Sequence, residues 1–192
     1  CGAGIGARDA KGLARLLRSS KPAYPNRVLN LETGSLAAEA ALKMLLARFY
    51  KPQDDSPKPK YRGKIPVIVV IGDFDGGIRA NYHGTTMLTQ MQRGMWDDLR
   101  AGMEKQGLYV IRAVRPNHNV ELEWVFDEFD RGKYKIAGLF HEIVLMNYAG
   151  KTLDPKFVKR MYALCKRHDV PTVVDEIQTG IWGPELFMYR EY

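Results

Sequence analysis

The sequence has few cysteines, no long apolar run and no apolar stretch in its first twenty residues. Its two cysteines, Cys1 and Cys165, lie far apart in 192 residues, so we expect no disulfide framework and take a reducing cytosol as the default compartment. The longest apolar run, residues 65–71, contains a proline and is far shorter than the roughly 18 residues of a membrane-spanning helix. No apolar stretch in the first twenty residues resembles a signal peptide. These absences argue against disulfide-rich secreted proteins and membrane-embedded proteins.

The composition is that of a globular domain, and its positive charge is uneven. Hydrophobic residues make up 45% and charged residues 27% of the chain. Of the net charge of +7, residues 1–27 carry +5, from six basic residues against Asp9. We interpret residues 1–27 as a basic segment, helical because four of its cations recur every three or four residues. A solvated helix face is favoured over a nucleic-acid site, since no aromatic residue is interleaved with those four cations.

Apolar runs alternate with segments of helical period, which predicts an α/β fold with a parallel sheet buried on both faces. The expected strands are residues 27–31, 65–71, 108–114, 136–146 and 172–174. Three helical stripes lie between them: Ala37, Ala40, Ala41, Met44 and Leu45; Leu122, Val125, Phe126 and Phe129; and Phe157, Val158, Met161, Tyr162 and Cys165. Asp154 and Pro155 are the expected N-cap and first residue of the last helix. The polar, proline-containing residues 51–64 predict an exposed loop and no domain boundary.

Two glycine-containing segments are candidate phosphate sites. Gly2, Gly4 and Ala7 match a dinucleotide-binding pattern, but no strand precedes them, so we interpret this segment as an edge of the chain. Thr33, Gly34 and Ser35 stand at an expected helix start, where free backbone N–H groups can bind phosphate. Plain N-capping is the alternative for the second segment.

Polar residues at the ends of the expected strands are the other candidates. Tyr82 and His83 follow residues 65–71, where an aromatic ring could stack on a flat ligand or simply pack. Asp175 and Glu176 end another apolar run and should point to opposite sides, one of them into the crevice at the carboxyl edge of the sheet. Glu142 supplies a second acid from a different strand. Neither a metal-ligand cluster nor a serine-hydrolase elbow is present in the sequence, so we expect no metal site.

Taken in order, four motifs resemble the large domain of class III aminotransferases, which are fold-type I enzymes dependent on pyridoxal 5'-phosphate (PLP). The motifs are T-G-S-L-A-A-E-A-A-L-K (residues 33–43), N-Y-H-G-T-T (81–86), H-E-I (141–143) and V-V-D-E-I-Q-T-G (173–180). The resemblance covers residues 28–192 and implies part of a three-layer α/β/α large domain with a mainly parallel sheet. The last motif is its most specific part.

The resemblance implies a role for each motif. Gly34 and Ser35 would bind the cofactor phosphate, Tyr82 would stack on the pyridine ring beside His83, and Gln178 would lie near the ring hydroxyl. Asp175 would pair with the pyridine nitrogen and keep it protonated, because a neighbouring carboxylate favours the charged form. Glu142 would lie at the cofactor or substrate end of the pocket, and with Asp175 it is the expected catalytic residue.

The family's Schiff-base lysine lies on the strand that follows the aspartate motif, and this chain has no lysine after Lys166. We therefore expect the chain to be a central piece of a longer enzyme, cut at both ends, without the small domain and unable to transaminate as it stands. The resemblance implies that the parent is a homodimer that uses a small amino donor and an oxo acid or aldehyde as acceptor. From the composition we expect it to be cytoplasmic, with no nucleic acid or membrane partner.

Two alternatives to an aminotransferase stay open. One is another PLP reaction on the same fold, such as that of an aminomutase, decarboxylase or racemase, because the fold does not determine the reaction. The other is a non-catalytic module, suggested by departures from the family pattern at Leu36, at Ile143 and at residues 182–185.

Overall fold

The structure is a computed structural model that describes residues 28–72, 86–92, 95–146, 148–180 and 187–192. The chain divides into two compact units, Cys1–Thr33 and Gly34–Tyr192. Residues 28–33 of the first unit form neither helix nor strand, so the strand expected over residues 27–31 is wrong wherever it can be checked. A strand needs a partner backbone to receive its hydrogen bonds, which local composition does not provide. Residues 1–27, predicted as a basic helical segment, lie outside the described part of the chain.

The second unit is built on a four-stranded parallel sheet with the order β2-β1-β3-β6. The strands are β1 (Ile65–Ile71), β2 (Val110–Val114), β3 (Tyr134–Glu142) and β6 (Thr172–Asp175). A two-stranded antiparallel ribbon, β4 (Val144–Leu145) with β5 (Lys151–Thr152), follows β3. The predicted parallel sheet is therefore confirmed. The strand predicted over residues 136–146 divides into β3 and β4, and β2 begins two residues after the start of the range predicted for it, 108–114.

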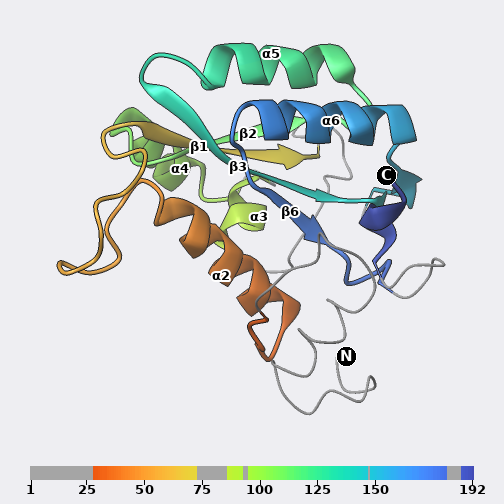
Figure 1. The fold of residues 1–192 in the computed structure, drawn as a ribbon, viewed down its shortest axis with the longest axis horizontal. Coiled ribbons are helices and arrows are strands. Elements are labelled where there is room, and N and C mark those ends of the chain that lie inside the picture. Colours follow the sequence, from red (N-terminus) through yellow and green to blue (C-terminus); the bar gives the residue numbers. More distant parts are fainter. Residues whose placement is uncertain (1–27, 73–85, 93–94, 147, 181–186) are drawn as a thin grey trace. The chain divides into compact units, whose positions relative to one another are not determined.

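Helices cover both faces of this sheet (Figure 1). α5 (Asn119–Phe129) and α6 (Pro155–Arg167) lie on one face, and α2 (Gly34–Leu46) and the short α3 (Met87–Gln92) lie on the other. α4 (Asp97–Lys105) precedes β2, and a 3₁₀ turn, η1 (Met188–Glu191), follows the last strand. The three-layer arrangement expected from the resemblance is thus present in the second unit.

Side-chain packing confirms two of the three helical stripes. The four apolar residues expected on α5 are all buried, and on α6 only Tyr162 of the expected stripe is half-buried. Asp154 caps α6 as predicted, because its side chain accepts a hydrogen bond from the Lys156 backbone at 2.7 Å. The stripe predicted on α2 is fully buried only at Leu45. The helix buries Ala38 and Leu42 instead and leaves Ala37 and Met44 exposed. α2 is apolar on nearly every side, so its periodicity does not define a single face.

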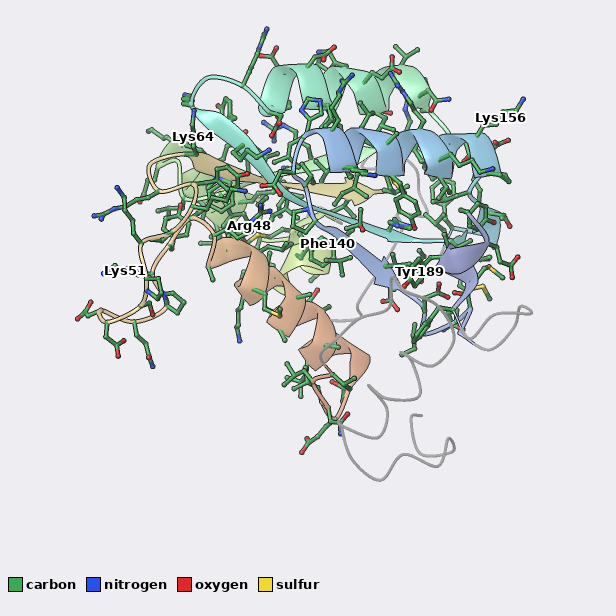
Figure 2. The ribbon with its side chains drawn as sticks, in the orientation of Figure 1. Arg48, Lys51, Lys64, Phe140, Lys156 and Tyr189 are labelled. Carbon is green, nitrogen blue, oxygen red and sulfur yellow. The ribbon has the colours of Figure 1, made fainter. Side chains whose placement is uncertain are left out.

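A glycine sets how closely α2 approaches the sheet. A Cβ atom at Gly138, in the middle of β3, would lie 2.4 Å from Cδ1 of Leu45 on α2. Side chains at positions 138, 140 and 142 of β3 share a face because side chains alternate along a strand. Gly138, Phe140 and Glu142 therefore belong to the face that α2 covers, and Figure 2 labels Phe140 within the core.

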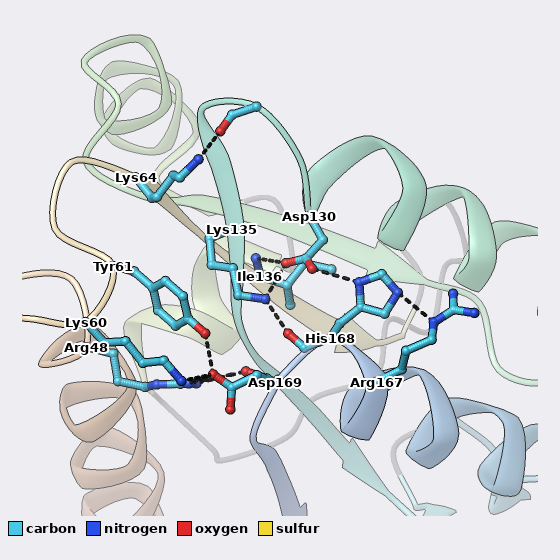
Figure 3. A network of polar contacts seen from close by, with 11 residues as sticks. Arg48, Lys60, Tyr61, Lys64, Asp130, Lys135, Ile136, Arg167, His168 and Asp169 are labelled. Carbon is cyan, nitrogen blue, oxygen red and sulfur yellow. Dashed lines mark hydrogen bonds and ion pairs between the residues drawn. The ribbon is translucent and has the colours of Figure 1, made fainter.

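The amino edge of the sheet is closed by a network of ion pairs (Figure 3). Asp130 accepts hydrogen bonds from Lys135 at 2.7 Å and from the Ile136 backbone at 2.9 Å, and lies 2.8 Å from the ring of His168. Asp169 binds Arg48 and Lys60, each at 2.6 Å, and also accepts from the Tyr61 hydroxyl. The contacts of Asp169 join the loop of residues 51–64 to the turn after α6. As predicted, this loop contains neither helix nor strand.

Candidate active site

The candidate site lies at the carboxyl edge of the sheet, where β1, β3 and β6 end. β2 follows β1 in the chain and pairs with one side of it, whereas β3 pairs with the other side. The direction in which strands are added therefore reverses between β1 and β3. Open α/β sheets bind ligands in the crevice beyond the carboxyl ends of the strands at such a switch point.

Two carboxyl groups meet at this edge. Glu142 and Asp175 are register partners at the last position of β3 and β6. Partners in a parallel pair point to the same face, so both side chains belong to the face covered by α2. The structure thus brings together the two residues that the sequence predicts as catalytic.

Glu142 is the more unusual of the two carboxyl groups. The residue is only 4% exposed, and among the described residues its Oε2 atom has no hydrogen-bond partner. Burial raises the pKa of the Glu142 carboxyl to about 8, and the negative charge of Asp175 acts in the same direction. Glu142 therefore holds a proton at neutral pH and can donate it.

The turn after β6 brings the aspartate motif to the start of α2. A Cβ atom at Gly34 would lie 3.1 Å from Cδ1 of Ile177, so the first residue of α2 and this turn are neighbours. Asp175 accepts a hydrogen bond from the Ile177 backbone at 2.9 Å, which shapes the turn. Gln178, in the same turn, is exposed. Gly34, Ser35, Asp175 and Gln178 consequently belong to one region, as their proposed shared role requires.

Glu176 has a structural role that the sequence reasoning did not anticipate. Its carboxylate accepts from the Thr179 hydroxyl and, at 2.7 Å, from the backbone of Tyr189, which is labelled in Figure 2. Of the two consecutive acids, Asp175 lies at the strand end beside Glu142, whereas Glu176 holds the turn and η1 in place.

Part of the predicted site falls outside the described residues. Tyr82 and His83 are in residues 73–85, which the structure does not describe. The described chain resumes at Thr86, which is buried, and the next residue, Met87, donates its backbone N–H to Glu39 of α2 at 3.2 Å. The first described residues after positions 82 and 83 therefore contact α2.

A further pair of polar side chains lies on the opposite face of β3. His141 is fully buried, and its Nε2 lies 3.1 Å from the hydroxyl of Tyr162 on α6. Its Nδ1 lies 3.3 Å from the carbonyl oxygen of Glu142. The sequence analysis placed Tyr162 in an apolar stripe and His141 in the H-E-I motif, and nothing in their spacing indicated that the two side chains would meet.

The described residues offer neither a metal-ion cluster nor a membrane-spanning helix. Within the part of the chain that the structure describes, no three His, Cys, Asp or Glu side chains gather as a metal ion would require. The same described ranges contain no helix that is both long and apolar enough to cross a membrane.

Comparison with known proteins gives one consistent family. The model of the family "Aminotransferase class-III" matches residues 3–184 and so begins before the first motif of the resemblance. The 5-aminovalerate aminotransferase of Pseudomonas aeruginosa is 28% identical over 177 residues, which are 88% of this chain and 36% of that protein. The adenosylmethionine-8-amino-7-oxononanoate aminotransferase of Mycobacterium leprae is 25% identical over 185 residues, 92% of this chain and 38% of that protein.

Solved structures show the same fold. An ornithine aminotransferase from Toxoplasma gondii, crystallised with partial occupancy of PLP at its active site, matches with a TM-score of 0.58 and 21% identity. It covers 91% of this chain and 36% of its own. A transaminase with L-alanine matches with a TM-score of 0.59 and 18% identity, over 93% of this chain and 41% of its own. This chain therefore spans little more than a third of the length of the proteins it matches.

Proposed function

Because this chain belongs to the class III aminotransferase family, we propose that the whole protein transfers an amino group from a small amino donor to an oxo acid or aldehyde. The observation that carries the proposal is the pair of carboxyl groups, Glu142 and Asp175, at adjacent strand ends beside the start of α2. In that arrangement one acid can hold a cationic ring nitrogen while the other holds a proton near the reacting atoms.

The residues at this edge fit PLP as the cofactor. The cofactor phosphate carries a charge of about −1.5 to −2 at neutral pH and is stabilised by the positive end of a helix dipole. α2 is 13 residues long and begins with Gly34 and Ser35, which are small enough for close approach of a phosphate. The unpartnered Oε2 atom of Glu142 is a further sign that a ligand completes this edge, since buried polar atoms in proteins are nearly always hydrogen-bonded.

Each residue has a distinct task in this proposal. When bound, PLP supplies an electron sink for the carbanion formed at the substrate carbon. Asp175 holds the ring nitrogen protonated, because a carboxylate in contact with it favours the charged form. Tyr82 would stack on the ring beside His83, and Gln178 would bind near the ring hydroxyl.

Glu142 is proposed to act through its proton. With a pKa raised to about 8 it is a neutral acid at pH 7, so it can donate a hydrogen bond without placing a second negative charge beside Asp175. A carboxyl group of that kind suits the cofactor or substrate end of the pocket, where a proton has to be held and returned.

The test is made on the whole protein, because no lysine follows Lys166 in this chain. We expect visible absorbance of bound PLP, and amino transfer when an amino donor and several oxo acceptors are supplied. The variant Asp175→Asn should lower the rate at least about 100-fold, since it removes the negative partner of the ring nitrogen. Asp127→Asn, the same change on the exposed surface of α5, is the matched control.

Three outcomes would count against the proposal. Absence of visible absorbance with added PLP would refute the cofactor assignment. Turnover of a substrate without amino transfer would point to another PLP reaction. Equal rates in the Asp175→Asn and Asp127→Asn variants would remove Asp175 from the site.

The assembly and compartment of the whole protein are part of the same proposal. The resemblance supports a homodimer, which sedimentation of the whole protein would test. The two widely separated cysteines, of which Cys165 is buried, favour the reducing cytoplasm.

A further inference from the structure

His141 and Tyr162 form a polar pair on the face of β3 opposite to the candidate site. His141 is 0% exposed, and its neighbour Glu142 points to the other face because consecutive strand residues alternate. A buried polar pair that directly adjoins a functional carboxyl group, but lies across the sheet from it, can act on that group only through the backbone.

The hydrogen bonds of His141 assign its protons. The carbonyl oxygen of Glu142 can only accept, so Nδ1 of His141 carries the proton that it donates across 3.3 Å. Burial lowers the pKa of His141 to about 4, so the ring is neutral and Nε2 has a free lone pair. Nε2 therefore accepts a hydrogen bond from the Tyr162 hydroxyl at 3.1 Å.

This chain of bonds ends at the point where β3 ends. Glu142 is the last residue of β3, and its carbonyl oxygen receives the His141 proton. The next carbonyl, that of Ile143, accepts instead from the Leu153 backbone at 2.9 Å, beside the β4–β5 ribbon. The backbone at Glu142, which pairs with Asp175 of β6, is thus also contacted by a side chain that is hydrogen-bonded to helix α6.

We propose that His141 and Tyr162 are positioning residues that hold the Glu142 carboxyl buried at the carboxyl edge of the sheet. Tyr162 fixes the ring of His141, and His141 fixes the carbonyl of Glu142. The inference rests on the proposed function only in that Glu142 belongs to the site; the bonds themselves do not depend on the cofactor. It makes α6, on the far face, a support of the site.

The charged and titratable groups around this pair are few. Asp175 on β6 faces Glu142 and raises its pKa. Tyr162 faces Glu176, Tyr189, Cys165 and Tyr192, which together with burial raise the pKa of its hydroxyl. Tyr162 therefore stays protonated and able to donate at any pH at which Glu142 titrates.

The experiment measures the titration of Glu142 itself. Infrared spectra of the whole protein, recorded across a pH series, contain the band of the protonated Glu142 carboxyl, which is identified by its loss in Glu142→Gln. Circular dichroism checks that each variant is folded. If the strand end loosens, water reaches the carboxyl group and its apparent pKa falls toward the ordinary value near 4.5.

Three substitutions separate positioning from packing. His141→Phe keeps a ring but removes both hydrogen bonds, and should lower the apparent pKa of Glu142 by at least about one unit. Tyr162→Phe removes a single hydroxyl and should lower it by about half a unit. His141→Asn retains an N–H near the position of Nδ1, so it should restore part of the shift caused by His141→Phe.

Tyr134→Phe is the matched control, since Tyr134 is a half-buried tyrosine at the other end of β3. It should leave the titration of Glu142 unchanged. The proposal is overturned if Glu142 titrates in folded His141→Phe and Tyr162→Phe as it does in the unsubstituted whole protein. That result would make the pair an ordinary part of the core. If His141→Phe does not fold, the shift in Tyr162→Phe decides. Failure to bind PLP would refute the proposed function without altering this result.

Discussion

The closest approach between α2 and the sheet gives a sharp prediction about stability. Gly138→Ala would place a Cβ atom 2.4 Å from Cδ1 and 2.9 Å from Cδ2 of Leu45. Carbon atoms in contact are usually about 3.5–4.0 Å apart, so either the leucine or the helix has to move. Leu45 is 5% exposed, so its side chain would have to move within the core.

The expected cost follows from these distances. Overpacking of a tight core costs about 1–3 kcal/mol. Replacing glycine by alanine also restricts the unfolded chain, which returns about 0.4–1 kcal/mol. We therefore expect Gly138→Ala to lower the free energy of unfolding by about 1–2 kcal/mol, measured as a lower midpoint of urea denaturation with an unchanged slope.

A second glycine and a double variant make this prediction refutable. Gly102 lies in α4, where an added Cβ would meet nothing within 4 Å, so Gly102→Ala should stabilise the protein by about 0.5–1 kcal/mol. In a Leu45→Ala background the clash is gone, and Gly138→Ala should cost at least about 1 kcal/mol less than it does alone. Stabilisation by Gly138→Ala, or additive effects in the double variant, would show that α2 does not lie on β3 as described.

Three further predictions concern charged groups. Because the pKa of Glu142 is raised to about 8 in the folded protein, stability should fall as pH rises from about 4.5 to about 8, by at most about 1.4 kcal/mol per pH unit. Urea denaturation across that range should show a flatter dependence in Glu142→Gln, and an identical dependence would contradict the burial of this carboxyl. Hydrogen bonds from Lys60 and Tyr61 lower the pKa of Asp169 to about 2, so its stabilisation is present above about pH 4 and lost toward pH 2. Asp169 is half exposed, so Asp169→Asn should remove less than about 1 kcal/mol at neutral pH and weaken the acid dependence of unfolding; a larger loss would mean that the network is more buried than described. Asp154→Ala should cost about 1 kcal/mol in urea denaturation by removing the cap of α6, whereas Asp154→Asn should cost much less, and equal losses would refute the cap.

The elements with strong local signals were predicted from the sequence. β1 matches its predicted bounds because IPVIVVI is continuous, β-branched and buried at six of seven positions. α6 was predicted from its first residue, because Asp154 and Pro155 mark its start in the chain itself. Such signals act within a few residues, so they do not depend on contacts elsewhere in the fold.

The helix α4, which was not predicted, lacks a buried apolar face. α4 buries none of its residues, and Leu99, one of its few apolar residues, is 47% exposed. The residue before it, Trp96, has a left-handed backbone with φ of 59°, which is an uncommon way for a helix to begin. The strand predicted over residues 27–31 is absent from the described residues 28–31 for the opposite reason. An apolar composition does not provide the neighbouring strand that a sheet requires.

The residues of the candidate site come from sequence motifs, whereas their neighbours depend on contacts across the fold. That Glu142 and Asp175 are register partners follows from the order β1-β3-β6, which no local pattern specifies. The pairing of His141 with Tyr162 needs both the alternation of β3 and the placement of α6 over it. Sequence motifs supplied the chemistry of the candidate residues, and only the topology supplied their neighbours.

The two edges of the sheet differ in how their buried acidic side chains are hydrogen-bonded, and that contrast supports placing the site at the carboxyl edge. At the amino edge, both carboxylate oxygens of Asp130 lie within hydrogen-bond distance of a nitrogen, which offsets the cost of burying the charge. At the carboxyl edge, Glu142 is buried, and its Oε2 atom has no hydrogen-bond partner in the described part of the chain. A buried polar atom without a partner lowers the stability of the folded protein. The burial of Glu142 beside its register partner Asp175 is explained if a ligand supplies the missing hydrogen-bond partner.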